Sequence, residues 1–200
     1  MPYSEFLTLK QVEHKFELKT RINNLFQKPI DKVSLSQFLQ NDLEEAKDMP
    51  LSSEKAKSEA VIAPILREVR RKKKTFSFFS GYTFDVDANQ SLNGVCDFLL
   101  TLRIDKPDIS APVFCIVEAK NRTVEEGLGQ CAAEMYAAYL FNKQEGENIT
   151  TIYGCVTTAN EWKFLKYENK TIEIDKDLYY LNQVEEILGI MLWVLNQYQV

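Results

Sequence analysis

A short apolar run places two opposite charges side by side at residues 118–120. Val113 to Val117 is a continuous apolar stretch of β-branched, aromatic and cysteine side chains, which is typical of a strand buried on both faces. Glu118 and Lys120 follow it two positions apart, and side chains at i and i+2 of a strand point to the same side. Desolvating either charge costs several kcal/mol unless the charge is compensated. The pair therefore indicates either an internal ion pair at the rim of a sheet or a metal-dependent hydrolytic site.

A second carboxylate lies on the preceding predicted strand. Residues 95–102 form an apolar, strand-like segment with Asp97 near its start. If the two strands form an antiparallel hairpin in which Leu102 pairs with Val113, Asp97 lies opposite Glu118 with the Cβ atoms ~5 Å apart. Two carboxylates this close repel each other unless a proton or a cation lies between them. The spacing predicts a divalent cation with oxygen ligands.

Two predicted helices carry further polar residues near this site in the sequence. A helix over residues 52–73 carries Glu54 and Glu59 ahead of its apolar stripe, although surface glutamates favoured by the helix dipole are an equally good interpretation. A later helix, over residues 123–141, is predicted to open with a capping box at Thr123 and carries Gln130 on its flank.

One run of cations stands out in a chain with a formal net charge of −5. It ends the helix over residues 52–73 and consists of Arg70, Arg71, Lys72, Lys73 and Lys74. Cations stabilise a helix C-terminus through the helix dipole, so a solvated helix end is one interpretation. The other is phosphate contact, because a local basic strip allows an acidic protein to bind nucleic acid.

Composition places the chain among globular proteins of one domain. Its 200 residues, 45% hydrophobic and 26% charged, are enough to bury a core. The four cysteines lie in apolar segments without C-x-x-C spacing, which predicts buried thiols in a reducing cytoplasm rather than a zinc site. No signal-peptide pattern begins the chain, and no apolar run approaches the ~20 residues that span a bilayer. We therefore expect a cytoplasmic protein without a membrane partner.

The order of the predicted elements indicates an α/β protein. Helical spacing covers residues 4–26 and 36–49, so residues 1–50 are expected to form an N-terminal helical extension. Residues 51–200 are predicted to contain the helix over 52–73, interrupted at Pro64, then three or four strands, a helix, strands at 149–157 and 162–174, and a terminal helix from about residue 182. This order predicts a central mixed sheet flanked by helices.

The motif residues resemble those of the PD-(D/E)xK nuclease superfamily across roughly residues 53–165: Asp97, Glu118-Ala119-Lys120 and, on the next helix, Gln130. The segment over residues 53–66 is similar to the opening helix of the N-terminal nuclease region of type I restriction enzyme R subunits. The whole chain also resembles a family of uncharacterised bacterial, often cyanobacterial, proteins that carry E-A-K-N followed by G-Q-C. Cys96 replaces the proline that often precedes the aspartate. The resemblance implies a restriction-endonuclease-like domain over residues 51–200.

The resemblance also implies roles for the residues. Asp97, Glu118 and the carbonyl of Ala119 would hold Mg²⁺ or Mn²⁺. Glu59 would contact the metal through water, with Glu54 as the competing candidate. Lys120 would position the attacking water and stabilise the pentacovalent charge, and Gln130 would orient Lys120 or the scissile strand. The implied catalytic set is Asp97, Glu118, Lys120, Gln130 and Glu59.

The function that these observations predict is Mg²⁺-dependent hydrolysis of nucleic acid, with a DNA endonuclease of restriction or repair type as the first choice. A non-catalytic nucleic-acid- or protein-binding module that keeps the nuclease fold is the alternative, and the acidic net charge favours it. A third interpretation is a purely structural ion cluster. The expected partners are nucleic acid, DNA first, and a second copy of the chain in a homodimer.

Overall fold

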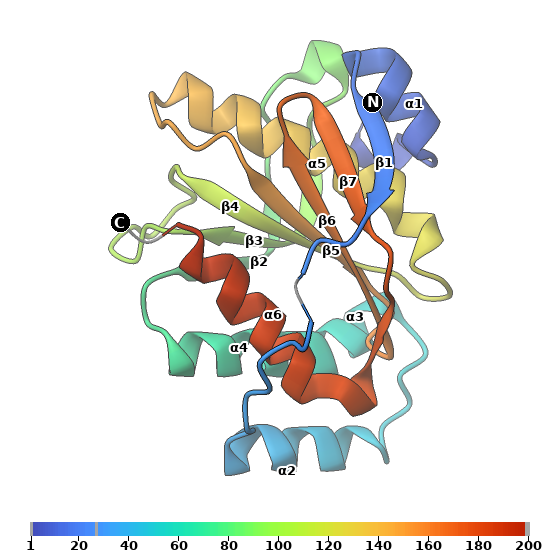
Figure 1. Cartoon of the computed structure of the whole chain (residues 1–200), viewed down its shortest axis with the longest axis vertical. Coiled ribbons are helices and arrows are strands. Elements are labelled where there is room, and N and C mark those ends of the chain that lie inside the picture. Colours follow the sequence, from blue (N-terminus) through green and yellow to red (C-terminus); the bar gives the residue numbers. More distant parts are fainter. Residues whose placement is uncertain (1, 27, 199–200) are drawn as a thin grey trace.

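A single mixed sheet organises the structure, which is a computed structural model that describes residues 2–26 and 28–198 (Figure 1). Within these residues the sheet has eight strands in the order β1-β7-β6-β5-β4-β3-β2, with β8 paired to β6. The β1–β7 and β4–β5 pairs are parallel and the other pairs are antiparallel. The strands are β1 (Lys19–Asn23), β2 (Ser77–Thr83), β3 (Val95–Thr101), β4 (Val113–Ala119), β5 (Ile152–Thr157), β6 (Glu161–Glu168), β7 (Thr171–Asp175) and β8 (Tyr179–Tyr180). The predicted α/β class with a central mixed sheet is confirmed.

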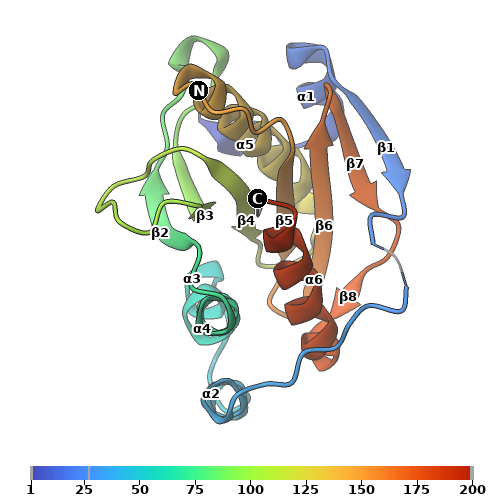
Figure 2. The same cartoon turned by 60° about the vertical axis from the view of Figure 1, so that its left-hand side comes forward.

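Helices cover both faces of the sheet (Figures 1 and 2). One face packs against α1 (Leu9–Phe16) and α5 (Glu125–Gln144). On the other face lie α4 (Ala63–Lys72), which continues from α3 (Glu54–Lys57), and α6 (Val184–Asn196), while α2 (Gln37–Ala46) packs against α4. Successive side chains of a strand point to opposite faces, so Ile116 of β4 belongs to the α5 core and Val117 to the opposite core. By the same alternation, Glu118 faces α5.

The first fifty residues contribute to the sheet, which corrects the expected helical extension. After α1 ends, Glu17 adopts a left-handed conformation with φ of 53°, and the chain then forms β1 in parallel with β7. The predicted continuation of the helix past Phe16 is wrong because side-chain bonds, one of them to the distant strand β7, hold the chain extended there. The N–H and hydroxyl of Thr20 donate to Glu13, and Arg21 forms an ion pair with Glu173 of β7.

The helix predicted over residues 52–73 is present, with a π-helical turn in its middle. Ser53 caps α3, the π turn covers Ser58–Ile62, and α4 follows directly. Pro64 has no backbone N–H, and its ring would collide with the carbonyl four residues earlier in a regular α-helix. The wider turn, in which the Ala63 N–H donates to the Ser58 carbonyl, accommodates it. The predicted interruption at Pro64 is therefore a π turn that leaves the helix continuous.

A buried carboxylate on α4 fixes the neighbouring helix α2. Glu68 is fully buried and accepts hydrogen bonds from the N–H (3.0 Å) and hydroxyl (2.7 Å) of Ser36, the N-cap of α2. Arg71 and Lys72 lie 3.2 and 3.4 Å from the same carboxylate. Burial by itself would raise the pKa of Glu68, but the bonds from Ser36 and the two cations together lower it.

We expect Glu68→Gln to reduce the free energy of unfolding at pH 7 by about 2 kcal/mol, because an amide cannot balance the two cations. The folded-state pKa is lowered, so the ionised carboxylate contributes stability above its unfolded-state pKa and loses that contribution as the pH falls through the folded-state value. Urea unfolding of both proteins at pH 7 and pH 3 measures this. The difference between them should nearly close at pH 3, and an equal difference at both pH values would contradict the assignment.

The predicted β3–β4 hairpin forms with a corrected anchor point. Thr101, rather than Leu102, pairs with Val113, because a bulge shifts the register at this end of β3. Beyond the bulge Phe98 pairs with Val117. This is the register in which Asp97 and Glu118, one residue further along each strand, were predicted to be neighbours. The wrong pairing partner predicted for Val113 therefore does not change the strand pairing near the candidate site.

The structure also bears on two predictions made from composition, one about the cysteines and one about membrane-spanning segments. The four cysteines are buried free thiols, as expected, and burial raises the pKa of each of them. Among the residues that the structure describes, none of the helices combines the length and apolar character needed to cross a bilayer.

Candidate active site at the ends of β3 and β4

The ends of β3 and β4 bring the two predicted carboxylates together. The β3–β4 ladder ends at the pair Phe98 and Val117, and the Asp97 carboxylate then accepts a hydrogen bond from the N–H of Ala119 at 2.8 Å. The N–H and C=O of one strand residue point to the same side, so the Ala119 carbonyl also faces the β3 side. Glu118 is 1% exposed, and burial first, then the negative charges of Glu134 and Asp97, raise its pKa.

Lys120 joins β4 to helix α5. Its backbone N–H donates to the Thr157 carbonyl at 2.8 Å, which extends the contact between β4 and β5. Its ammonium donates to Glu118 Oε1 at 2.6 Å and to Gln130 Oε1 at 3.0 Å. The lysine side chain is 14% exposed, so this contact is largely removed from water. The structure thus brings Glu118, Lys120 and Gln130 into direct contact.

Helix α5 accommodates the lysine because Gly127 has no side chain. A Cβ at this position would lie 2.5 Å from Val156 Cγ1 and 2.9 Å from Lys120 Cγ, both shorter than real contacts. Gln130 lies three residues later on the same face of the helix. The stem of Lys120 therefore packs at one turn of α5 and its ammonium binds at the next.

We expect Gly127→Ala to displace Lys120 and to lower the free energy of unfolding by roughly 1–2 kcal/mol. Overpacking costs roughly 1–3 kcal/mol and outweighs a helix-propensity gain of about 1 kcal/mol. Urea unfolding in a double-mutant cycle with Lys120→Ala isolates the part due to the lysine. The cost of the added methyl group should fall once the lysine is removed. A cost that is the same in both backgrounds would show that Val156 alone opposes the alanine.

The start of α5 differs from the prediction. Val124 occupies the N-cap position in a right-handed helical conformation, and no side-chain hydrogen bond caps the helix. Thr123 therefore lies outside the helix, and the predicted capping box is wrong. The helix also continues to Gln144, beyond the predicted end at residue 141.

The structure adds Glu134, a residue for which no role was predicted from the sequence. Glu134 is fully buried on α5, and Gln130 Nε2 donates to its Oε1 at 3.0 Å. The Oε2 atoms of Glu118 and Glu134 are both buried, and neither has a hydrogen-bond partner within the described part of the chain. A sequence signal existed: Glu134 is a carboxylate four residues after Gln130, next to the buried Met135.

Three carboxyl groups face one ammonium in this cluster, and burial controls their ionisation. Burial raises the pKa of Glu134 to about 8. Burial, then the charges of Glu134 and Asp97, raise the pKa of Glu118 well above its usual range despite the opposing effect of Lys120. Burial also raises the pKa of Asp97, against the effects of the Ala119 N–H and Lys120. For Lys120 burial opposes the charged form, but the carboxylates, Glu118 first, raise its pKa. The raised pKa values favour retention of a carboxyl proton by the cluster near neutral pH, and because Glu118 and Glu134 interact, that proton belongs to the pair rather than to either residue.

The donor atoms fit a hard divalent cation that is shared with a substrate. Asp97, Glu118 and the Ala119 carbonyl supply oxygens, and the buried Oε2 of Glu118 has no hydrogen-bond partner among the described residues. Over residues 2–26 and 28–198, no group of three His, Cys, Asp or Glu side chains is arranged to hold one ion. Mg²⁺ is commonly bound through one or two carboxylates, with water and substrate phosphate completing its shell. The two-carboxylate set is consistent with Mg²⁺ or Mn²⁺ in that mode.

The structure distinguishes between Glu54 and Glu59, the two glutamates of the first long helix that were candidates for a metal contact. The Glu59 side chain is 69% exposed and lies 4.0 Å from Lys55 of the same helix. Glu54 instead acts on the site electrostatically, because its charge raises the pKa of both Asp97 and Lys120. The exposure of Glu59 and the electrostatic effect of Glu54 therefore favour Glu54, the competing candidate, as the carboxylate that this helix contributes.

The basic run lies at the far end of the same helix. Arg71 follows Glu54 by 17 residues, which is about 25 Å along a helix. Arg71 and Lys72 form ion pairs with the buried Glu68, and Lys73 donates to Asn196 of α6. These contacts favour the interpretation of Arg71, Lys72 and Lys73 as a helix end bound to its own protein. These contacts do not test the predicted phosphate contact at residues 70–74.

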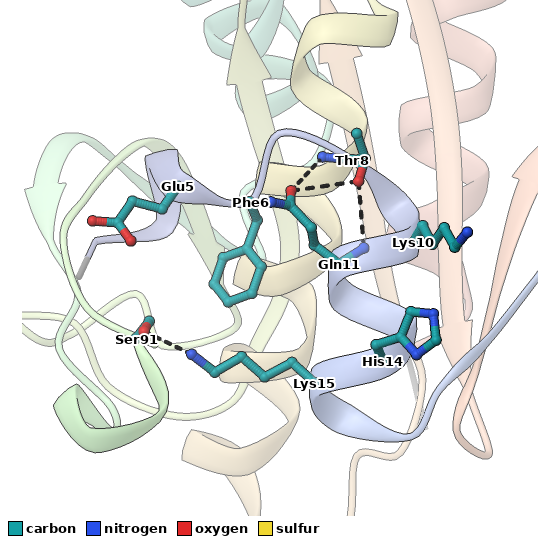
Figure 3. Close-up of a pocket in the computed structure, with 8 residues that line it drawn as sticks. All are labelled: Glu5, Phe6, Thr8, Lys10, Gln11, His14, Lys15 and Ser91. Carbon is teal, nitrogen blue, oxygen red and sulfur yellow. Dashed lines mark hydrogen bonds between the residues drawn. The ribbon is translucent and has the colours of Figure 1, made fainter.

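A separate cavity of about 570 Å³ lies beside α1 (Figure 3). Lys15 extends along it, with Nζ 2.7 Å from the Ser91 hydroxyl and 5.3 Å from the centre of the Phe6 ring. His14 lies at its edge and is exposed, in line with a solvent-facing histidine. The residues that line this cavity do not include Asp97, Glu118 or Lys120.

Comparison with known proteins gives no match: no family model, no curated protein and no solved structure is similar to the chain at a significant level. Any function assigned to the cluster must therefore be argued from the residues themselves.

Proposed function

We propose that the chain is a metal-dependent nuclease whose active site contains Asp97, Glu118 and Lys120. The observation that supports this most strongly is the buried contact at the end of β4, where Lys120 donates to Glu118 at 2.6 Å beside Asp97. Perturbed ionisable groups clustered in this way are a frequent feature of catalytic sites. The resemblance of these residues to the PD-(D/E)xK motif directs the proposal to phosphodiesters.

Each residue has a role in this proposal. Asp97, Glu118 and the Ala119 carbonyl would hold Mg²⁺ or Mn²⁺, which when bound would activate water and offset phosphate charge. Lys120 donates to the attacking water or to a phosphate oxygen and offsets the negative charge that develops there. Gln130 keeps the ammonium in place through its 3.0 Å hydrogen bond. Removal from bulk water strengthens these electrostatic interactions.

The finer assignments follow from the same proposal. The mixed sheet is of the restriction-endonuclease-like type, and the substrate is nucleic acid, with DNA as the first choice. Restriction- or repair-type cleavage is the activity. The phosphate-binding surface includes the exposed Lys74 at the end of the basic run.

A non-catalytic binding module that keeps this fold is the second candidate, and one observation favours it. The polar groups of the cluster largely satisfy one another, since Lys120 binds Glu118 and Gln130, and Gln130 in turn binds Glu134. With the lysine side chain only 14% exposed, the cluster has the features of a structural ion pair as well as those of a catalytic site.

The test is incubation of wild type and Glu118→Ala with single- and double-stranded DNA and RNA, in Mg²⁺, Mn²⁺ or EDTA. We expect cleavage by wild type that requires the metal and disappears in Glu118→Ala. Equal cleavage by both proteins would reject the assignment. Nucleic-acid binding by wild type without cleavage under any of these conditions would select the binding module.

A further inference from the structure

Glu134 has no role in the proposed chemistry, yet it is the most deeply buried member of the cluster. Its side chain lies on α5 at zero exposure, and Gln130 Nε2 donates to Glu134 Oε1 at 3.0 Å. The Cys96 thiol and Asp97 also lie near enough to affect the pKa of Glu134. Burying a carboxyl group in this way opposes folding unless it gains compensating bonds. Its other oxygen has no partner in the described chain, so burial here is not explained by hydrogen bonding alone.

The contact with Glu134 determines which end of the Gln130 amide faces Lys120. A glutamine side chain has an oxygen that accepts and a nitrogen that donates. Because Glu134 Oε1 accepts from the nitrogen, the oxygen is directed toward the Lys120 ammonium, which it binds at 3.0 Å. The reversed amide would place its N–H groups against the ammonium and its oxygen against the carboxyl group. Only one orientation satisfies both neighbours.

We propose that Glu134 is a positioning residue that locks the Gln130 amide and thereby holds the Lys120 ammonium against Glu118. The three α5 positions involved, Gly127, Gln130 and Glu134, lie on one face of the helix. Gly127 leaves room for the stem of Lys120, and Gln130 binds its ammonium. Glu134 orients Gln130. The kinetic part of this proposal rests on the proposed nuclease function, whereas the orientation of the amide does not.

Two substitutions separate positioning from packing. Glu134→Gln keeps an oxygen that can accept from Gln130. Glu134→Met fills a similar volume, has no oxygen acceptor, and removes a buried carboxyl group, so we expect it to be at least as stable as wild type above pH 7. A residue with a merely structural role would show activity that follows stability.

The first readout is the side-chain amide signal of Gln130 in ¹⁵N–¹H NMR spectra, assigned by its loss in Gln130→Met. We expect similar shifts and slow exchange with solvent in wild type and Glu134→Gln, and a large shift with fast exchange in Glu134→Met. An unchanged Gln130 signal in Glu134→Met would overturn the proposal, whether or not the protein cleaves nucleic acid.

The second readout is steady-state cleavage. We expect Glu134→Met to lower kcat by about tenfold or more, with KM changed by less than twofold, and Glu134→Gln to remain within about threefold of wild type. Equal losses in both variants, or none in Glu134→Met, would overturn the positioning role. If wild type does not cleave, the nuclease function fails, and the NMR readout still decides whether Glu134 orients Gln130.

Discussion

Lys120→Met is expected to lower the rate of metal-dependent nucleic-acid cleavage by at least about a hundredfold, because the Lys120 ammonium contacts the site carboxylate Glu118 at 2.6 Å. Methionine has a similar length and packs well in apolar surroundings, so the stem can still occupy the space beside Gly127. The loss should therefore appear in kcat while the protein remains folded. Cleavage kinetics together with urea unfolding of the same preparation measure both quantities.

Lys166→Met provides the matched control. Lys166 is also a partly buried lysine on the sheet, 22% exposed, and it lies 3.0 Å from Glu168 and 3.5 Å from Glu173. The two variants thus remove similar ion-paired lysines from different parts of the sheet. We expect a comparable change in stability and normal cleavage for Lys166→Met. A similar loss of cleavage in both variants would mean that the effect of Lys120 is general rather than catalytic.

Glu118→Gln is expected to raise the melting temperature in the absence of metal and to abolish stabilisation by Mn²⁺. The folded-state pKa of Glu118 is raised, by burial first and then by the charges of Glu134 and Asp97. A raised pKa means that stability is fully present below the unfolded-state pKa and is lost as the pH rises toward the folded-state value. The amide side chain in Glu118→Gln does not ionise, so the variant does not lose stability in this way as the pH rises. The difference between variant and wild type should therefore grow from pH 4.5 to pH 8.

The Mn²⁺ response tests the metal site without a substrate. An ion that binds only the folded state at about 100-fold above Kd stabilises it by roughly 2.7 kcal/mol. For a domain of this size that corresponds to a rise of about 5–10 °C in Tm. We expect this rise in wild type and little response in Glu118→Gln. Calorimetry that detects no Mn²⁺ binding to wild type, even with a cleavage-resistant oligonucleotide present, would reject the metal site.

Glu173→Gln is a control with the opposite sign. Glu173 is also a buried glutamate, but although burial opposes its charge, bonds from Arg21 and Asn23 and the charge of Lys166 lower its pKa. Its ionised form therefore stabilises the fold above its unfolded-state pKa. We expect Glu173→Gln to melt below wild type at pH 8 and to keep the normal Mn²⁺ response.

The parts of the site that could be predicted are those set by local sequence. The apolar run before Glu118 specifies a buried strand, and the alternation of side chains then places Glu118 and Lys120 without any knowledge of the rest of the fold. The pairing of β3 with β4 needed only a short connection. Even there the bulge at Thr101 was invisible, because a register shift changes pairing without changing the apolar pattern.

The parts that could not be predicted depend on distant contacts. Residues 19–23 form a largely exposed strand with Ile22 facing solvent, so no buried alternation distinguished a strand from a helix. Glu134 belongs to a helix that is buried nearly all round, where the sequence alone does not show which neighbour a carboxylate will meet. The choice between Glu54 and Glu59 depended on where the helix lies relative to β3, which spacing does not determine.

The edge strand β1 has a consequence for the order of folding and for association between copies. It pairs with β7, and Arg21 binds Glu173, which lies 152 residues later in the chain. Closing so long a loop costs entropy that is recovered only once the rest of the sheet exists. We therefore expect β1 to join last and to detach first, with amide protons at residues 19–23 exchanging faster than those of β4. Each detachment uncovers the backbone of β7, and an uncovered strand edge is a template on which a second chain can pair.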